Sequence, residues 1–174
     1  MTIRAARFNI ILLLFLCGAV LSGCKTTEEK AKKKEATIIS FHLEVNPDGT
    51  PTSAPVPIYR AQPFMVNVQK VAFLDTSYIR KAEVVDTADG FVMRIWFEPG
   101  GAARLDGYTA SYKGQRIAVM AQWTEARWLA APRITHRLNE GVLVFTPDCN
   151  RREAERIVNG INNLVAKLSK PFVF

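Results

Sequence analysis

Cysteine and histidine are scarce in this sequence of 174 residues, which contains three cysteines and two histidines. A structural zinc site takes four cysteine or histidine ligands at short spacings, and His42 and His136 stand far apart without a second such ligand beside them. The carboxylates do not cluster at ligand spacing. The sequence therefore predicts neither a metal site nor a cofactor.

Local catalytic motifs are missing as well. The chain has no glycine-rich phosphate loop, no Gly-x-Ser-x-Gly, no Cys-x-x-Cys and no His-x-x-His. We therefore expect that the protein is not an enzyme. An enzyme whose active residues converge from distant positions is left open as an alternative, because such a site leaves no local pattern.

The first part of the chain lacks an apolar run long enough to cross a membrane as a helix. The apolar stretch of residues 10–21 has about a dozen residues, whereas the hydrocarbon core takes roughly 20. Arg4 and Arg7 precede the stretch and Ser22-Gly23-Cys24 ends it, which is the pattern of a secretory signal peptide. Residues 1–23 are therefore predicted to be removed.

The residues Leu21-Ser22-Gly23-Cys24 resemble the lipobox of bacterial lipoproteins. The resemblance implies cleavage between Gly23 and Cys24, a diacylglycerol on the Cys24 sulfur and an acyl chain such as palmitate on the new amino group. Two or three acyl chains anchor a protein stably, whereas one binds only marginally. Lys25 follows the cysteine, which in such lipoproteins implies the outer membrane, facing the periplasm. The alternative is a soluble secreted protein with an unrelated cysteine at its cleavage site.

The charge of the chain is mildly basic. The formal net charge is +7, and loss of Arg4 and Arg7 with the signal peptide leaves +5. Residues 24–35 are rich in lysine and glutamate and lack aromatics, which predicts a flexible lipidated tether beside an anionic membrane surface. Further along the chain, arginines are interspersed with acidic residues instead of forming a basic stripe with aromatics. We therefore expect no nucleic-acid partner.

Cys149 is the one cysteine outside the signal peptide and the lipidation site, so no intramolecular disulfide is expected. It lies at the start of a predicted helix, whose dipole could activate a thiol, but no histidine is near it in the sequence. Free cysteines often pack as small apolar residues. We interpret Cys149 as a packing residue and keep a nucleophile as the alternative.

Residues 36–73 are predicted to hold two strands and a proline-rich connection. Largely alternating apolar residues predict a strand over 38–45, which the turn sequence Asn46-Pro47-Asp48-Gly49 ends. The prolines of residues 51–57 argue against regular structure, and a second strand is expected around 65–71. A larger domain, residues 74–170, is expected to follow.

The clearest local signals in residues 74–170 are a hairpin turn and a helix. Ala88-Asp89-Gly90 separates two apolar runs, and an amphipathic helix is predicted to begin at Thr146-Pro147 and to reach residue 168. The other expected elements are a helical turn over 74–81, strands over 82–86, 91–97, 116–123 and 142–145, and a helix over 102–112. Together they predict a single α+β domain with a mostly antiparallel sheet and two main helices packed on one face.

Five segments between residues 74 and 168 form an ordered set. They are residues 74–82, 91–97 and 114–119, then Ala131-Pro132-Arg133-Ile134 with Leu138 and Gly141, then Phe145-Thr146 with Glu153-Ala154. The set resembles the periplasmic head region of SecD and SecDF, accessory subunits of the bacterial protein-export channel. Residues 122–128 are about three residues longer than the matching turn of that family. No set of transmembrane helices follows, so a lone head would lack the family's coupling of proton movement to export.

The segment from Trp123 to Trp128 also carries Arg127, and tryptophan and arginine are enriched in binding hot spots. We interpret Trp123, Arg127 and Trp128 as candidate partner contacts, with packing of the indoles in the core as the alternative.

The whole chain is interpreted as a membrane-anchored periplasmic lipoprotein that acts as a noncatalytic protein-interaction module, linked to protein export or envelope assembly. Its partners would be the bilayer and an envelope protein or exported polypeptide. A structural scaffold of the envelope is the second hypothesis, and a periplasmic enzyme the third.

Overall fold

A computed structural model describes residues 35–47, 49 and 51–169. In chain order its elements are β1 (Ile38–Leu43), β2 (Ser53–Ile58), β3 (Phe64–Gln69), β4 (Leu74–Asp75), the 3-10 turn η1 (Thr76–Tyr78), β5 (Ile79–Thr87), β6 (Gly90–Phe97), α3 (Pro99–Ser111), β7 (Ile117–Gln122), β8 (Ala126–Ala130), β9 (Val142–Phe145) and α4 (Arg151–Leu168). Neither α3 nor α4 has the length and apolar character that a membrane-spanning helix requires.

The strands of the described residues pair antiparallel and form three sheets. The orders are β4-β1-β7-β8, β2-β3 and β5-β6-β9. β1 lies between β4 and β7, so the first strand of the described residues shares a sheet with strands from the later part. The predicted single α+β domain with antiparallel pairing and two main helices is confirmed.

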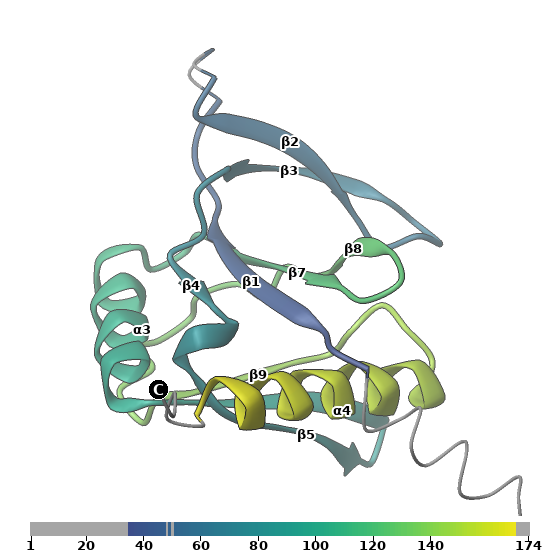
Figure 1. Ribbon diagram of the computed structural model, residues 1–174. Helices are drawn as coiled ribbons and strands as arrows, with labels where there is room; N and C mark the ends of the chain where they lie inside the picture. The colour runs from purple at the N-terminus through teal and green to yellow at the C-terminus, as the bar shows by residue number, and fades with distance from the viewer. Residues whose placement is uncertain (1–34, 48, 50, 170–174) are drawn as a thin grey trace, which may run out of the picture. The chain divides into compact units, whose positions relative to one another are not determined.

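The main core combines side chains of the four-stranded sheet, the three-stranded sheet, α3 and α4. Phe41 of β1 meets Phe97 of β6 edge to face, with ring centroids 5.3 Å apart, and this contact joins the two sheets. A smaller cluster lies beneath the β2–β3 hairpin, where Val56 and Val68 pack against Ala118 of β7. Figure 1 shows that hairpin on the side of β1 away from α4, so β1 is covered on both faces.

β2 shows that the prediction of an irregular proline-rich connection was wrong. Lys70 N donates to Thr52 O at 2.9 Å, so these opposite residues form a hydrogen-bonded pair. In an antiparallel ladder such hydrogen-bonded pairs recur at every second residue, here along β2 and β3. Pro55 and Pro57 fall at the alternate positions, whose backbone faces away from β3. Proline there costs the strand no ladder hydrogen bond. The same prolines leave the outer edge of β2 without two of its N–H donors.

The predicted hairpin over residues 82–97 is confirmed as β5 and β6, and Gly90 at the turn has a φ of 133°. α3 and the strands β7 and β9 also lie where the sequence predicts elements. β8, in contrast, was missed: its pairing with β7 contains a bulge and places two tryptophans in a hairpin that the local pattern does not predict.

The start of α4 was also predicted wrongly. The helix begins at Arg151 and not at Thr146-Pro147, because Asn150 Oδ1 accepts a hydrogen bond from Glu153 N at 2.9 Å and caps it. Asp148 N instead donates to Leu129 O of β8 at 2.7 Å. This bond holds the residues before the cap against the edge of β8, where they cannot form a helical turn.

The outer edge of β5 is capped by a side chain of α4. Asn162 Oδ1 accepts a hydrogen bond from Ala82 N, and Asn162 Nδ2 donates to Ala82 O, both at 2.9 Å. The amide group therefore takes the place that the peptide group of a further strand would occupy. The buried face of α4 packs on the core through Ala154, Ile157 and Ile161.

Gly160 lies in α4 where the chain that enters β1 crosses the helix. A Cβ at Gly160 would lie 2.9 Å from Thr37 Cβ and 3.0 Å from Thr37 N, which is closer than van der Waals contact. Glu35 pairs with Arg156 at 2.9 Å, and Asn163 Nδ2 donates to Glu35 O at 3.0 Å. Residues 35–37 are thus held along α4 by close packing and polar contacts together.

Gly160→Ala is expected to lower the free energy of unfolding by about 1–2 kcal/mol. The added methyl group forces Thr37 away from the helix, and this strain exceeds the gain of roughly 1 kcal/mol in helix propensity. Denaturant unfolding followed by circular dichroism measures the change. Asn159→Ala, at the exposed neighbouring position, is the matched control and should leave stability unchanged or slightly raised. A stabilised Gly160→Ala variant would contradict the close approach.

Asn162→Ala is expected to lower the free energy of unfolding by about 1–3 kcal/mol, because both polar groups of Ala82 lose their partner. Hydrogen exchange followed by NMR should show faster exchange of the Ala82 amide in this variant. The exposed Asn159→Ala substitution should leave that amide as it is in the wild type. Unchanged protection of Ala82 in Asn162→Ala would show that the side chain does not cap the strand.

Candidate functional site

The predicted lipidation and cleavage residues, Gly23 and Cys24, lie outside the described residues. The three candidate partner contacts lie in the β7–β8 hairpin, with Trp123 in its turn and Arg127 and Trp128 in β8. All three are partly buried.

Trp123 and Arg127 lie together on the side of β8 that faces α4. The Arg127 guanidinium is 5.1 Å from the centre of the Trp123 ring, and Arg127 Nη2 pairs with Glu153 Oε1 of α4 at 2.6 Å. The Arg127 side chain is 13% exposed. Its charge is therefore engaged within the domain, between the turn of the hairpin and the first turn of α4.

Trp128 lies apart from that pair. Its side chain packs on the cluster beneath the β2–β3 hairpin, and its ring meets the His42 ring edge to face at 5.1 Å. Neighbouring residues of a strand point to opposite faces, so Arg127 and Trp128 cannot contribute to one flat patch. The structure brings Trp123 and Arg127 together and separates Trp128 from them, and a role of the three in partner binding stays a prediction.

Ser40 and His42 form a hydrogen-bonded serine–histidine pair in β1. His42 Nδ1 lies 2.8 Å from Gln69 O and must carry the proton, so Nε2 accepts from Ser40 Oγ at 2.9 Å. Burial lowers the pKa of His42, which favours the neutral ring. Ser40 is 8% exposed and His42 6%, so both are enclosed between β1 and the β2–β3 hairpin. The pair is arranged as a satisfied part of the interior.

Cys149 is half-buried and packs against the main core, as its interpretation as a packing residue predicts. Burial, with a smaller contribution from the negative charge of Glu153, raises the pKa of its thiol to about 11. The thiolate is therefore rare near neutral pH, and thiolate is the form that attacks. Among residues 35–47, 49 and 51–169, no group of three or more acidic, histidine or cysteine side chains could hold a metal ion.

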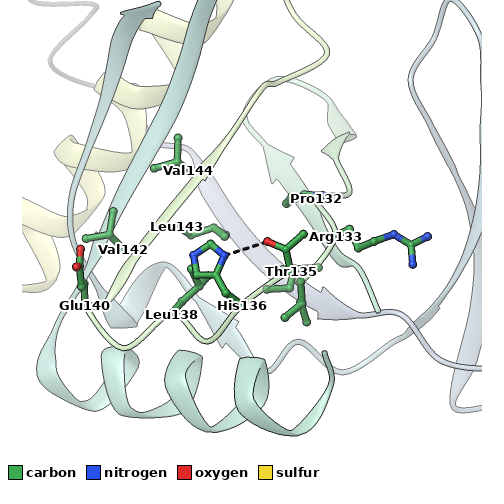
Figure 2. A pocket seen from close by; sticks show the side chains of 11 residues that line it. Pro132, Arg133, Thr135, His136, Leu138, Glu140, Val142, Leu143 and Val144 are labelled. Carbon is green, nitrogen blue, oxygen red and sulfur yellow. Dashed lines mark hydrogen bonds between the residues drawn. The ribbon is translucent and has the colours of Figure 1, made fainter. Parts of the chain in front are cut away.

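A pocket of about 350 Å³ opens beside β9 (Figure 2). Figure 2 shows the β9 side chains of Val142 and Val144 on one side and Pro132 and Arg133 on the other. The full lining is Ile117, Pro132, Arg133, Ile134, Thr135, His136, Leu138, Glu140, Val142, Leu143 and Val144. Apolar walls thus meet a small number of polar groups at the rim.

The wall opposite β9, residues 132–138, is held by hydrogen bonds to two other elements. Ile134 N donates to Gln115 O at 2.7 Å, and Ile117 N donates to Pro132 O at 2.9 Å. Towards α3, Leu138 N donates to Thr109 Oγ1 at 2.9 Å. These bonds fix the wall at both ends, so the pocket is preformed.

An ion pair and a glycine complete the frame of the pocket. Arg137 pairs with Asp106 of α3, and its hydrogen bond lowers the pKa of the Asp106 carboxyl. Gly141 has a φ of 67° and approaches Ala102 so closely that a Cβ there would lie 2.6 Å from the Ala102 Cβ. This tight turn sets the start of β9 against α3.

The rim carries Thr135 and His136, whose Oγ1 and Nδ1 atoms are 2.9 Å apart, and Glu140. Such a combination of apolar walls and few polar groups binds a ligand with an apolar portion and some hydrogen-bonding capacity. Sequence reasoning did not identify this site. The sequence predicted a strand over residues 142–145 and singled out residues 131–134 as a separate segment. Nothing in the sequence indicates that the two segments lie on opposite sides of a pocket.

No protein-family model matches the chain, and no curated protein matches it. Among solved structures, the chain is similar to one described as a membrane component SecDF that enhances protein export. The two share 14% identity with a TM-score of 0.56, over 81% of this chain and 69% of that one. A second solved structure, of SecDF in a super-membrane-facing form, also shares 14% identity with a TM-score of 0.56 over 81% of this chain. The similar region makes up 21% of that longer protein.

At this level of identity the likeness concerns the fold alone. It extends over 81% of this chain. The described domain therefore has a SecDF-like fold, as the five sequence segments predict.

Proposed function

We propose that this protein is a membrane-anchored periplasmic lipoprotein whose folded domain binds polypeptide in an extended or unfolded state. The observation that carries the proposal is the preformed pocket beside β9. Its apolar walls and sparse polar rim suit a chain that presents both side chains and peptide groups. The solved SecDF protein with a similar fold enhances protein export, which supports a substrate of this class.

The anchor supports the same role. Acylation of Cys24 would place the domain at the end of a tether that reaches at most about 40 Å from the sulfur to Glu35. A domain confined to that layer would meet polypeptides as they emerge from or approach the membrane. Confinement raises the local concentration of a binding site without any new contact, so modest intrinsic affinity suffices.

The role is proposed to be noncatalytic. The serine–histidine pair of Ser40 and His42 is enclosed, and burial raises the pKa of the Cys149 thiol to about 11. Both groups are therefore poorly placed to attack a substrate. Polypeptide binding needs no reactive group, and the pocket is built of side chains suited to packing and hydrogen bonding.

Replacement of Cys24 tests the anchor. Cys24→Ser removes the sulfur that would accept the diacylglycerol, so mass spectrometry of the variant should show no acyl groups. Mass spectrometry of the purified wild type should show a chain that begins at residue 24 and carries acyl groups. A wild-type protein without acyl mass, or one recovered only from the aqueous fraction, would overturn the lipoprotein assignment.

In-cell crosslinking tests the substrate. A photoreactive residue in place of Thr135, at the rim of the pocket, should yield crosslinks to many different exported polypeptides. These crosslinks should fade when protein synthesis is blocked, because the supply of unfolded chains then ends. The same residue at Asn159, on the exposed face of α4, is the matched control and should yield few.

The pattern of crosslinks separates the alternatives. One fixed envelope protein, crosslinked at Thr135 whether or not synthesis continues, would point to a structural scaffold and contradict the polypeptide-binding role. Equal yields at Thr135 and Asn159 would remove the pocket from the proposal.

A further inference from the structure

Three outer strand edges of the described domain, other than that of β9, are each engaged or blocked at one or two positions. Asn162 pairs with both backbone groups of Ala82 on β5. On β2, Pro55 and Pro57 stand at the outward positions and have no N–H to offer. On β8, Leu129 O accepts from Asp148 N at 2.7 Å. Proteins close edges in such ways because an open edge recruits further strands.

β9 is the outer strand of its sheet, and its edge is open among the described residues. Phe97 N donates to Gly141 O at 3.0 Å, so this pair is hydrogen-bonded, and the alternation continues with Ile95 and Leu143. Val142 and Val144 fall between these pairs. Their N–H and C=O groups therefore point away from β6, towards the pocket that both residues line.

The space beside that edge is the pocket of about 350 Å³, whose walls are largely apolar. A strand lies about 4.8 Å from its neighbour and turns alternate side chains to opposite faces of the sheet. Side chains on the inner face would enter the pocket against Ile117, Ile134 and Leu143. Those on the outer face would lie beside Val142 and Val144, of which Val144 is 44% exposed.

We propose that an extended polypeptide segment adds to the outer edge of β9 as a fourth strand of the β5-β6-β9 sheet. This inference rests on the proposed function and specifies its mode of binding. The backbone groups of Val142 and Val144 would supply affinity for any sequence, and the apolar wall would select apolar or β-branched side chains at alternate positions. Recognition through the backbone suits a module that must accept many different chains.

The geometry favours a single polypeptide segment over a second copy of the domain. Residues 132–138 stand beside the edge as a fixed wall, with bonds to residues 115–117 and to α3. In the proposed arrangement a single strand lies between that wall and β9. In a dimer formed by two β9 edges, each copy would bring its own wall into the space that the partner strand has to occupy.

Val144→Pro tests the inference, because it removes an outward N–H without removing a hydrogen bond to β6. The binding assay uses the full chain, purified in detergent, and a short fluorescent peptide in which valine and threonine alternate. Val144→Thr has a changed side chain but keeps the N–H. Val144→Pro should bind the peptide about three- to tenfold more weakly than Val144→Thr, the loss expected for one hydrogen bond.

NMR hydrogen exchange on the wild-type chain gives a second readout that does not depend on folding of the proline variant. Peptide addition should slow exchange of the Val142 and Val144 amides. The Leu143 amide, already bonded to Ile95, should change much less. These changes should saturate together with the fluorescence signal of the bound peptide.

The outcomes distinguish the mode of binding from the proposed function. If the wild type binds the peptide and Val144→Pro equals Val144→Thr, with no new protection of the two amides, strand addition is wrong and polypeptide binding stands. If the wild type binds neither this peptide nor a reduced, unfolded protein, both proposals fail. If protection of Val142 and Val144 rises with protein concentration alone, the occupant is a second copy and the inference is overturned.

Discussion

The free-energy cost of an unpaired backbone group at a strand edge is the constraint on which this domain depends. A sheet presents a row of N–H and C=O groups at each edge, and each group needs a partner or water. Here a helix side chain pairs with β5, the backbone of Asp148 pairs with β8, and prolines remove donors from β2. These solutions come from distant parts of the chain, which ties the sheets to α4 and to the segment that leads into it.

The edge of β9 differs from the edges of β2, β5 and β8 in this respect. In the part of the chain that the structure describes, the edges of β5, β8 and β2 carry such contacts or prolines, whereas the edge of β9 carries none and lies beside the pocket. The pocket wall owes its position to α3 and to residues 115–117, so the edge and its surroundings are held in a fixed geometry without a ligand. Preorganisation of this kind lowers the entropic cost of ordering a flexible partner.

The point at which the chain enters the domain is equally constrained. Thr37 lies against Gly160, and Glu35 is bonded to Arg156 and Asn163 of α4. A tether that begins at the membrane would therefore join a firmly packed region that includes β1 and α4. β1 is central in the four-stranded sheet and covered on both faces, so the chain enters the described domain at one of its most buried strands.

Local patterns in the sequence were sufficient for the elements whose signals lie within a few residues. The Asp-Gly turn identified the β5–β6 hairpin, and the spacing of apolar residues identified the amphipathic face of α4, because turn chemistry and helical periodicity are properties of neighbouring residues. The ordered segments also indicated the SecDF-like fold. The prolines of residues 51–57 led to the wrong prediction that this segment is irregular. The effect of a proline on a strand depends on whether its backbone faces the partner strand, and that follows from the register with β3.

The start of α4, the pairing of β8 and the pocket could not be derived in the same way. Asn150 caps the helix while Asp148 bonds to β8, and β9 becomes an open edge only through the strand order of its sheet. Each of these depends on contacts between residues far apart in the chain, whose energies have no signature in local composition. Residue types alone were thus enough to predict an α+β domain with a SecDF-like fold, whereas the surface that would receive a partner exists only once the sheets have assembled.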